Sequence, residues 1–278
     1  MDELYLQKGK ITYQIIGYYF RYLYMFRWFF ILFFTTSLGA QNLDEPKTIH
    51  VYVALCDNVN QGIVPVSKAL GNGQNPSSNL YWGALYGVKT HFKRSKDWSL
   101  VKTLESPNPN ILERVLFKHN TTNTYLLADA YDGAHIKQTT IDFLKAATGD
   151  LRESIEYDSS TLSFGGSSGM VAYIGHDGLM EFDIAVSLKP CNTEKRDAVI
   201  LACISKDFFA PYLKKTGANP LLWTTGLMAP EAYTLKWAID GWILGETDAQ
   251  IRERAAAAYH HYQKCGMRGA RNLLVTGF

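Results

Sequence analysis

The sequence lacks an excess of charge of either sign and has no basic run. Lys and Arg number 28 and Asp and Glu 26 in the 278 residues, which leaves a net charge of +2. A nucleic-acid-binding surface needs a concentration of positive charge, so we expect no nucleic-acid partner. Apolar residues make up 47% of the chain, and a chain of this size buries on the order of 70% of its unfolded surface.

Cysteine is also scarce. The four cysteines, Cys56, Cys191, Cys203 and Cys265, show none of the CxxC spacings that bind metal ions, so we expect no metal site and no cofactor. A disulfide framework is not expected in a domain of this size, although one pair, Cys191 with Cys265, stays open.

The first 40 residues have the pattern of a targeting segment. Arg21 and Arg27 precede an apolar run of about a dozen residues that ends in Gly39 and Ala40. A basic flank, a short apolar core and small residues before a cleavage point are typical of a secretory signal peptide, and the core is short for a membrane span of about 20 residues. We predict a signal peptide over residues 1–40 and a secreted or periplasmic protein. The alternative is an uncleaved anchor that holds an exported domain at the membrane.

Two short apolar runs in the second half of the chain organise the expected fold. Residues 170–174 and 198–202 have the length and composition of buried strands, and His176 follows the first run and Cys203 the second. In an open α/β sheet, ligands bind beyond the carboxyl ends of the strands. Neighbouring parallel strands would therefore present an imidazole and a thiol side by side, as a cysteine nucleophile with a histidine base requires.

The rest of the chain alternates between strand and helix patterns. Further strands are expected at 48–56, 123–129 and 220–224, and helices at 78–92, 134–147, 206–216, from 230, and at 247–264, where Thr247 and Gln250 form a capping box. Short strands at 99–104 and 112–117 would form a hairpin or an edge insert, 150–169 a flexible approach, and 272–278 an edge strand. We predict a single α/β domain over 41–278, a three-layer α/β/α sandwich with a mostly parallel sheet.

A cysteine nucleophile needs groups that activate its thiol. A free thiol titrates near pH ~8.5 and is a poor nucleophile at neutral pH, whereas His176, or the start of the helix near Lys206, would stabilise the thiolate of Cys203. The backbone N–H groups of Cys203 and of Asp177 or Gly178 would hold the oxyanion that forms in acyl transfer.

A third group usually orients the imidazole, and the loop after the first strand offers Asp57, Asn58 and Asn60. The plainer interpretation is that Cys203 is a small buried hydrophobe and that His176 is a solvated loop residue. The chain would then be an unrelated α/β hydrolase or a carbohydrate-binding domain.

Short motifs around this pair resemble the caspase–hemoglobinase cysteine peptidases, and within them the legumain-like branch. That family places histidine and glycine after one strand and Ala-Cys after the next. The segments that match are Tyr173–Gly178 and Ala202–Ser205. The legumain-like pattern continues with a strand that ends in Thr-Thr, matched by Thr224 and Thr225, and with a glutamate, matched by Glu231.

The resemblance implies a caspase-like sheet and a thiol peptidase. Cys203 would attack the scissile carbonyl, and His176 would act as general base and acid. Asn58 matches the early asparagine that orients the histidine in that family. The residues that match the Thr-Thr and glutamate motif would contact the substrate, so the expected substrate-binding residues are Thr224, Thr225 and Glu231.

Some positions depart from the family pattern. Asp177 stands between the histidine and Gly178, whereas the family glycine follows the histidine directly, and Lys206 replaces a glycine that is frequent after Cys-x-Ser. No basic residue matches the one that reads an Asn or Asp side chain, so specificity does not transfer. The leading hypothesis is an exported cysteine endopeptidase that acts on peptide or protein substrates. The alternative is a catalytically inactive caspase-like binding or scaffolding domain.

Overall fold

Eight strands form one mixed sheet in the computed structural model, which describes residues 45–278. The expected signal peptide therefore lies outside the described residues. Across the sheet the order is β10-β9-β8-β7-β1-β4-β3-β2. The strands are β1 (Lys47–Ala54), β2 (Trp98–Leu104), β3 (Ile111–His119), β4 (Thr124–Tyr131), β7 (Met170–Ile174), β8 (Asp197–Leu201), β9 (Asn219–Thr224) and β10 (Leu274–Val275). The five strands from β9 to β4 pair in parallel, which confirms the predicted, mostly parallel α/β sheet.

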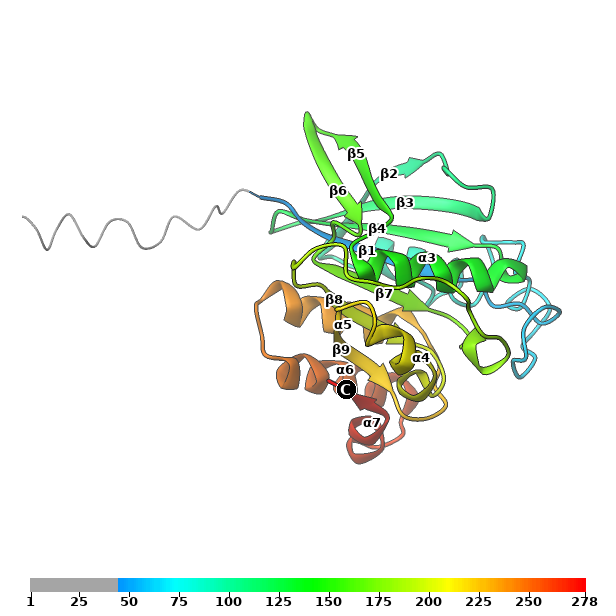
Figure 1. The fold of residues 1–278 in the computed structure, drawn as a ribbon. Helices are drawn as coiled ribbons and strands as arrows, with labels where there is room; N and C mark the ends of the chain where they lie inside the picture. The colour runs from blue at the N-terminus through cyan, green and yellow to red at the C-terminus, as the bar shows by residue number, and fades with distance from the viewer. Residues whose placement is uncertain (1–44) are drawn as a thin grey trace, which may run out of the picture. The chain divides into compact units, whose positions relative to one another are not determined.

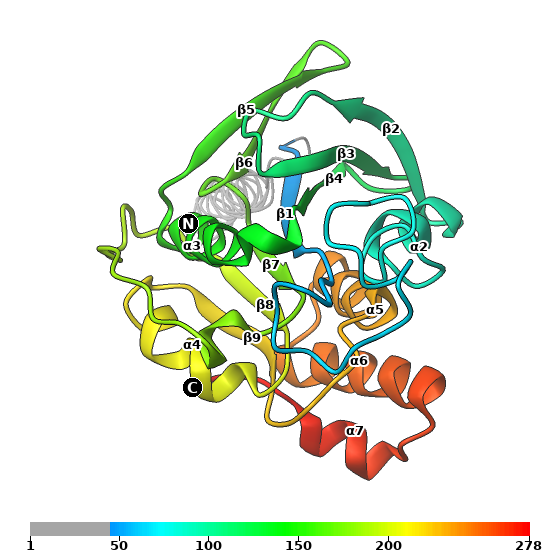
Figure 2. The same ribbon diagram turned by 90° about the vertical axis from the view of Figure 1, so that its right-hand side faces the viewer.

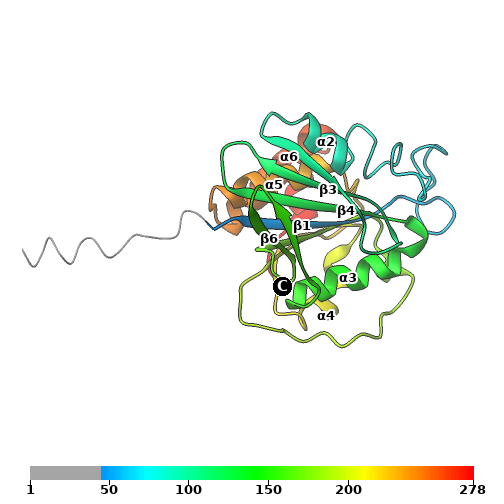
Figure 3. The same cartoon turned by 90° about the horizontal axis from the view of Figure 1, so that it is seen from above.

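Helices cover both faces of this sheet, so the unit has three layers (Figures 1, 2 and 3). They are α2 (Val88–Arg94), α3 (Ile136–Thr148), α4 (Ser205–Leu213), α5 (Ala232–Ile243), α6 (Asp248–Gln263) and α7 (Met267–Leu273), with short 3-10 turns η1 (Gly133–His135) and η2 (Gly178–Met180). Helices α2, α5 and α6 lie on one face, and α3 and α4 lie on the other. Between residues 45 and 278, none of the helices has both the length and the apolar character that a membrane crossing needs.

The central strand β1 shows why its sequence is almost continuously apolar. Ile49, Val51 and Val53 belong to the core under α5 and α6, whereas Tyr52 and Ala54 belong to the core under α3 and α4. Successive side chains of a strand point to opposite faces, and here each face is covered by helices. All five side chains are fully buried, as in the strands of other parallel sheets.

The prediction of a helix over residues 78–92 is wrong for residues 78–87. The segment runs through tight turns, and α2 begins only at Val88. The cause is Asn79, which is fully buried: its side chain accepts from the backbone N–H groups of Cys56 and Tyr81 and donates to the Cys56 carbonyl. These long-range bonds hold the segment against the end of β1, and a local helical pattern does not reveal them.

Residues 150–169 are not the flexible approach that the sequence suggests. They contain a second, two-stranded sheet of β5 (Arg152–Tyr157) and β6 (Ser160–Gly165). Leu162 and Phe164 of β6 are buried against Leu116 and Leu127 of the main sheet. The polar, half-exposed sequence of β5 concealed the hairpin.

The smaller predictions mostly hold. The 99–104 and 112–117 strands form an antiparallel pair, Thr247 and Gln250 form the capping box, and the tail adds the edge strand β10. The short helix α7, which precedes β10, was not expected.

A buried charged network joins the β5–β6 hairpin to the main sheet. The Arg114 guanidinium donates to both carboxylate oxygens of Asp129, at 2.6 Å each, and to Glu153 Oε2 at 2.5 Å. His50 Nε2 lies 2.9 Å from Asp129 Oδ2. Although burial opposes it, the bonds to His50 and Arg114 hold the pKa of Asp129 below its usual value.

We predict that Arg114→Ala lowers the free energy of unfolding by about 3–5 kcal/mol, because it leaves the buried Asp129 carboxylate without its main partner. Chemical denaturation monitored by circular dichroism measures the change. Arg271→Ala is the matched control: Arg271 pairs with Glu253 on the exposed surface, where water screens the pair, so its midpoint should barely move. Equal effects of the two substitutions would contradict the structural role of the network.

Candidate active site

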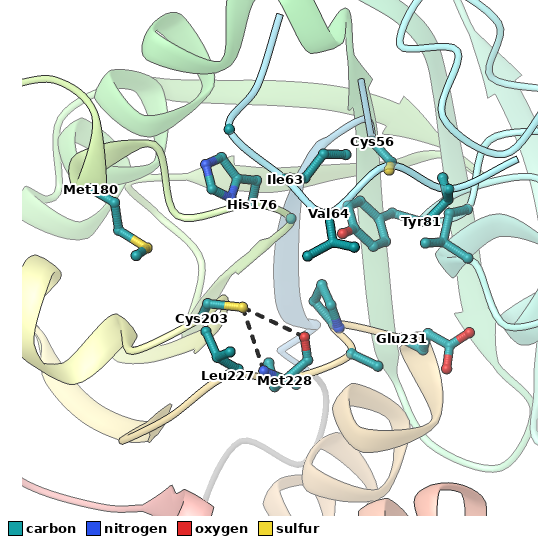
Figure 4. Close-up of a pocket in the computed structure, with 16 residues that line it drawn as sticks. Cys56, Ile63, Val64, Tyr81, His176, Met180, Cys203, Leu227, Met228 and Glu231 are labelled. Carbon is teal, nitrogen blue, oxygen red and sulfur yellow. Dashed lines mark hydrogen bonds between the residues drawn. The ribbon is translucent and has the colours of Figure 1, made fainter. Parts of the chain in front are cut away.

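The register of three parallel strands brings His176 and Cys203 to one edge of the sheet. Ile174 at the end of β7 lies opposite Leu201 at the end of β8. His176 and Cys203 are each the second residue after these paired positions. Both line one pocket, which has a volume of about 380 Å³ (Figure 4). The structure thus brings together the two residues that the sequence analysis selected for nucleophile and base.

Gly175 allows the chain to turn from β7 into this pocket. Its φ is +150°, and a Cβ there would lie 2.7 Å from the Ala54 carbonyl oxygen. Only glycine fits this close approach to β1. The Gly175 N–H donates to the Leu201 carbonyl at 3.3 Å, which carries the β7–β8 pairing one residue further and fixes where His176 begins.

Cys203 sits in the sharp turn between β8 and α4. The next residue, Ile204, has φ +50°, a left-handed conformation that is rare for a β-branched side chain. Such strain costs on the order of 1–3 kcal/mol and is common at functional sites. The Ile204 N–H donates to the Gly226 carbonyl at 2.9 Å, which holds the turn. The Cys203 thiol is thereby placed just before the N-terminus of α4, where negative charge is favoured.

The Cys203 sulfur is held by the loop after β9. The Met228 N–H donates to Sγ at 3.4 Å, and the thiol donates to the Met228 carbonyl at 3.6 Å. Figure 4 shows the sulfur turned toward this backbone rather than toward the imidazole. No hydrogen bond joins Cys203 to His176 within residues 45–278.

The His176 imidazole is held by a glutamate that the sequence analysis did not select. Its Nε2 lies 2.8 Å from Glu181 Oε1, and the same oxygen accepts from the Gly62 N–H at 2.6 Å. Tyr173 donates its hydroxyl to the His176 carbonyl at 2.8 Å. A carboxylate accepts hydrogen bonds, so the contact assigns Nε2 as the donor, and in that tautomer of the neutral ring Nδ1 is the nitrogen that can accept a proton. Nδ1 has no partner in the part of the chain that the structure describes.

The expected oxyanion donors lie in the two loops that meet here. In residues 45–278 the backbone N–H groups of Cys203 and Asp177 have no intramolecular acceptor. Gly178 begins the turn η2, and the Asp177 side chain caps it by accepting from the Leu179 N–H at 3.1 Å. The Asp177 side chain is fully buried and its Oδ2 has no partner. This burial raises the pKa of Asp177 to about 7.

Asn58, the expected orienting residue, has another role in the structure. Its side-chain amide donates to the Val66 carbonyl at 2.8 Å and accepts from the Val66 N–H at 3.0 Å. These two bonds close the loop after β1. Asp57 and Asn60 bond each other in the same loop. The structure does not bring these three residues to the imidazole. Glu181 lies only five residues after the histidine, and its short separation is the one sequence signal that could have indicated it.

Of the three expected substrate-binding residues, Glu231 lines the pocket. Thr224 is fully buried and its hydroxyl lies 3.1 Å from the Ser205 hydroxyl, where it fixes the start of α4. Thr225 donates its hydroxyl to the backbone of α7. The Glu231 carboxylate accepts from the Tyr233 hydroxyl at 2.9 Å, and burial raises its pKa.

All four cysteines are free, so the open pairing of Cys191 with Cys265 is not formed. Cys56 also lines the pocket, but it is fully buried and burial raises its pKa to about 11. Cys203 is therefore the accessible thiol of the pocket.

Comparison with known proteins finds no matching family model, curated protein or solved structure. The site must therefore be interpreted from its own geometry.

One cluster outside the pocket has the spacing of metal ligands. Possible ligand atoms of His50, Asp129 and Glu153 lie within 4.8 Å of one another. The Arg114 guanidinium already binds both carboxylates and supplies a positive charge where a metal ion would otherwise sit. The cluster fits a structural ion network better than a metal site.

Asp177 should make stability depend on pH. Its pKa rises from 3.8 to about 7 on folding, so the buried carboxyl costs nothing below pH ~4 and its ionisation destabilises the fold as pH rises toward 7. The unfolding free energy of Asp177→Asn, minus that of the wild type, should therefore grow by on the order of 3 kcal/mol between about pH 4 and 8. Denaturant titrations at several pH values measure this difference. A difference that stays constant between these pH values would contradict it.

Proposed function

We propose that the chain is a cysteine peptidase in which Cys203 is the nucleophile and His176 its base. The observation that carries the proposal is the placement of a thiol and an imidazole with a free Nδ1 in one pocket, each two residues beyond the ends of paired strands. A nucleophile, a base and a third group that holds the base are the parts that covalent catalysis of this kind uses.

The proposed reaction needs only the protein, a peptide substrate and water. His176 Nδ1 takes the thiol proton, and the Cys203 sulfur bonds to the scissile carbonyl carbon. The C–N bond breaks and the imidazolium gives its proton to the leaving amine. Water then loses a proton to Nδ1 and attacks the thioester, and the acid leaves as the thiol is restored.

Groups that are already in the site would stabilise the charges that develop in this reaction. The start of α4 and the Met228 N–H favour a negative sulfur at Cys203. The unpaired N–H groups of Cys203 and Asp177 are available to a carbonyl oxygen that becomes an oxyanion. The Glu181 carboxylate supports the positive imidazolium of His176.

We further propose that the sheet is caspase-like and that the chain is related to the legumain-like peptidases. The strand followed by histidine and glycine, β7, is paired with the strand followed by Ala-Cys, β8, which supports the resemblance of the motifs. The third group differs, because Glu181 holds the imidazole where the resemblance expects Asn58. Peptide or protein substrates and export from the cytoplasm are proposed with it, the latter from the N-terminal sequence alone.

A non-catalytic binding module is the second candidate. The observation that favours it is the direction of the Cys203 thiol, which donates to the Met228 carbonyl and has no hydrogen bond to His176. Catalysis requires the thiol to rotate toward the imidazole when substrate binds. Apo active sites often have such loose geometry.

Alkylation by iodoacetamide, measured for each cysteine by mass spectrometry, should separate the two candidates. At about pH 6.5 we expect Cys203 to react about ten times faster than the exposed Cys191, because His176 and the start of α4 lie near Cys203. His176→Ala should bring the rate at Cys203 down to that of Cys191, and His261→Ala, on the exposed side of α6, is the control. A slow rate at Cys203 that is the same in the wild type and in His176→Ala would favour the binding module.

Cleavage itself should depend on the sulfur. Cys203→Ser should abolish hydrolysis of a peptide library while the circular dichroism spectrum and the thermal midpoint stay those of the wild type. Retained cleavage would exclude Cys203 as the nucleophile.

Glu181 should matter as a positioning residue. Glu181→Ala should lower the alkylation rate of Cys203 about ten-fold or more, since it frees the imidazole to rotate and removes the charge that supports the imidazolium. Glu181→Gln should restore part of the rate, because its carbonyl oxygen can still accept from His176 Nε2. Glu194→Ala, which removes an exposed carboxylate, is the matched control. Unchanged reactivity in Glu181→Ala would show that the bond is only structural.

A further inference from the structure

We propose that the pocket selects a substrate with a bulky, uncharged apolar side chain next to the bond that Cys203 attacks. This inference rests on the proposed function and names its substrate class. It follows from the walls of the pocket, from the charges that are absent from it, and from its position beside the thiol.

The walls of the pocket are mainly apolar and come from two separate segments. The segment between β1 and α2 contributes Ile63, Val64, Val66 and Leu80, and the loop between β9 and α5 contributes Leu227, Met228 and Pro230. Figure 4 shows the Val64 side chain pointing from the loop after β1 into the space beside Cys203. A cavity of about 380 Å³ lies in the range of about 300–1,000 Å³ that is usual for ligand sites.

Three apolar residues that line this pocket are also strongly exposed. Val64 is 87% exposed, Leu227 73% and Met180 41%. They belong to three different segments of the chain, yet they gather around one cavity. Apolar surface left in water in this way, around a concave site, is typical of a surface that a ligand covers. An apolar side chain would remove it from water and gain free energy in proportion to the buried area.

The charges of the pocket fit no ionic side chain. No Lys or Arg lines it among residues 45–278, so an acidic side chain would find no permanently charged cation there. Within the same described residues, Glu231 is the one carboxylate on its wall. Its Oε2 accepts from Tyr233 and Gln263, and Figure 4 shows the carboxylate turned away from Cys203. A basic side chain held beside Cys203 would therefore lose its hydration among apolar walls while the carboxylate points away from it.

The position of the pocket assigns it to the substrate rather than to another protein surface. Cys203 and His176 line the same cavity as the apolar residues. A side chain seated among Val64 and Leu227 would hold its own backbone carbonyl near the sulfur. Binding and chemistry would thus share one cavity, and the choice of side chain would decide which carbonyl the thiol meets.

Peptidyl chloromethyl ketones that differ only in the side chain next to the reactive carbon test this inference. We expect the leucyl and phenylalanyl probes to label Cys203 about ten-fold faster or more than the aspartyl, asparaginyl and arginyl probes, since an apolar pocket discriminates by about this factor. Iodoacetamide, which has no side chain, gives the intrinsic reactivity of the thiol for normalisation.

Substitutions in the wall should change the preference. Val64→Ser combined with Leu227→Ser should lower the ratio of the leucyl-probe rate to the iodoacetamide rate about ten-fold. Val59→Ser is the matched control: Val59 is also 87% exposed and lies in the same loop, but it does not line the pocket. Its ratio should equal that of the wild type.

The outcomes separate the inference from the proposed function. Equal rates for all probes, or a faster arginyl, aspartyl or asparaginyl probe, would overturn the apolar preference while His176-dependent labelling by iodoacetamide upholds the peptidase. If no reagent labels Cys203 faster than Cys191 in a manner that depends on His176, both proposals fail.

Discussion

The site depends on the parallel pairing of β7 with β1 on one side and with β8 on the other. Hydrogen bonds between β7 and β8 fix Ile174 opposite Leu201. His176 and Cys203, each two residues further on, are placed by this pairing. A shift of one residue would reverse the faces of β7 and separate the imidazole from the thiol. Burial of both faces of the three strands makes such a shift costly, so the hydrophobic core sets the geometry of the pocket.

The same constraint leaves the ends of the strands with unusual backbone. Gly175 crosses β1 too closely for any side chain, and Ile204 adopts a left-handed conformation directly after Cys203. Asp177 keeps a buried carboxylate oxygen without a partner. Each feature costs free energy, and all three lie within two residues of the proposed base or nucleophile. Such a concentration at one edge of the sheet is expected of a site kept for function rather than for stability.

The long segment between β1 and α2 links the pocket wall to the proposed base. Asn79 and Asn58 fold this segment back on the end of β1, and Gly62 then donates to the Glu181 carboxylate that holds His176. A side chain bound among the apolar residues of this segment would therefore press on the same loop that positions the imidazole. Under the proposed function, recognition of the substrate and orientation of the base would be coupled through one carboxylate oxygen, Glu181 Oε1.

The sequence by itself determined the strands that carry the site, because buried parallel strands are short apolar runs whose ends are marked by polar residues. His176 and Cys203 could be selected on that basis, and the alternation of strands and helices gave the fold class. Only the tertiary structure decided the rest. Glu181 replaced Asn58 at the imidazole, Asn79 prevented a helix, and the polar β5–β6 hairpin formed on Arg114 and Asp129. These outcomes depend on hydrogen bonds between residues that are distant in the chain or outside any periodic pattern, and only the short separation of Glu181 from His176 is a signal in the local sequence.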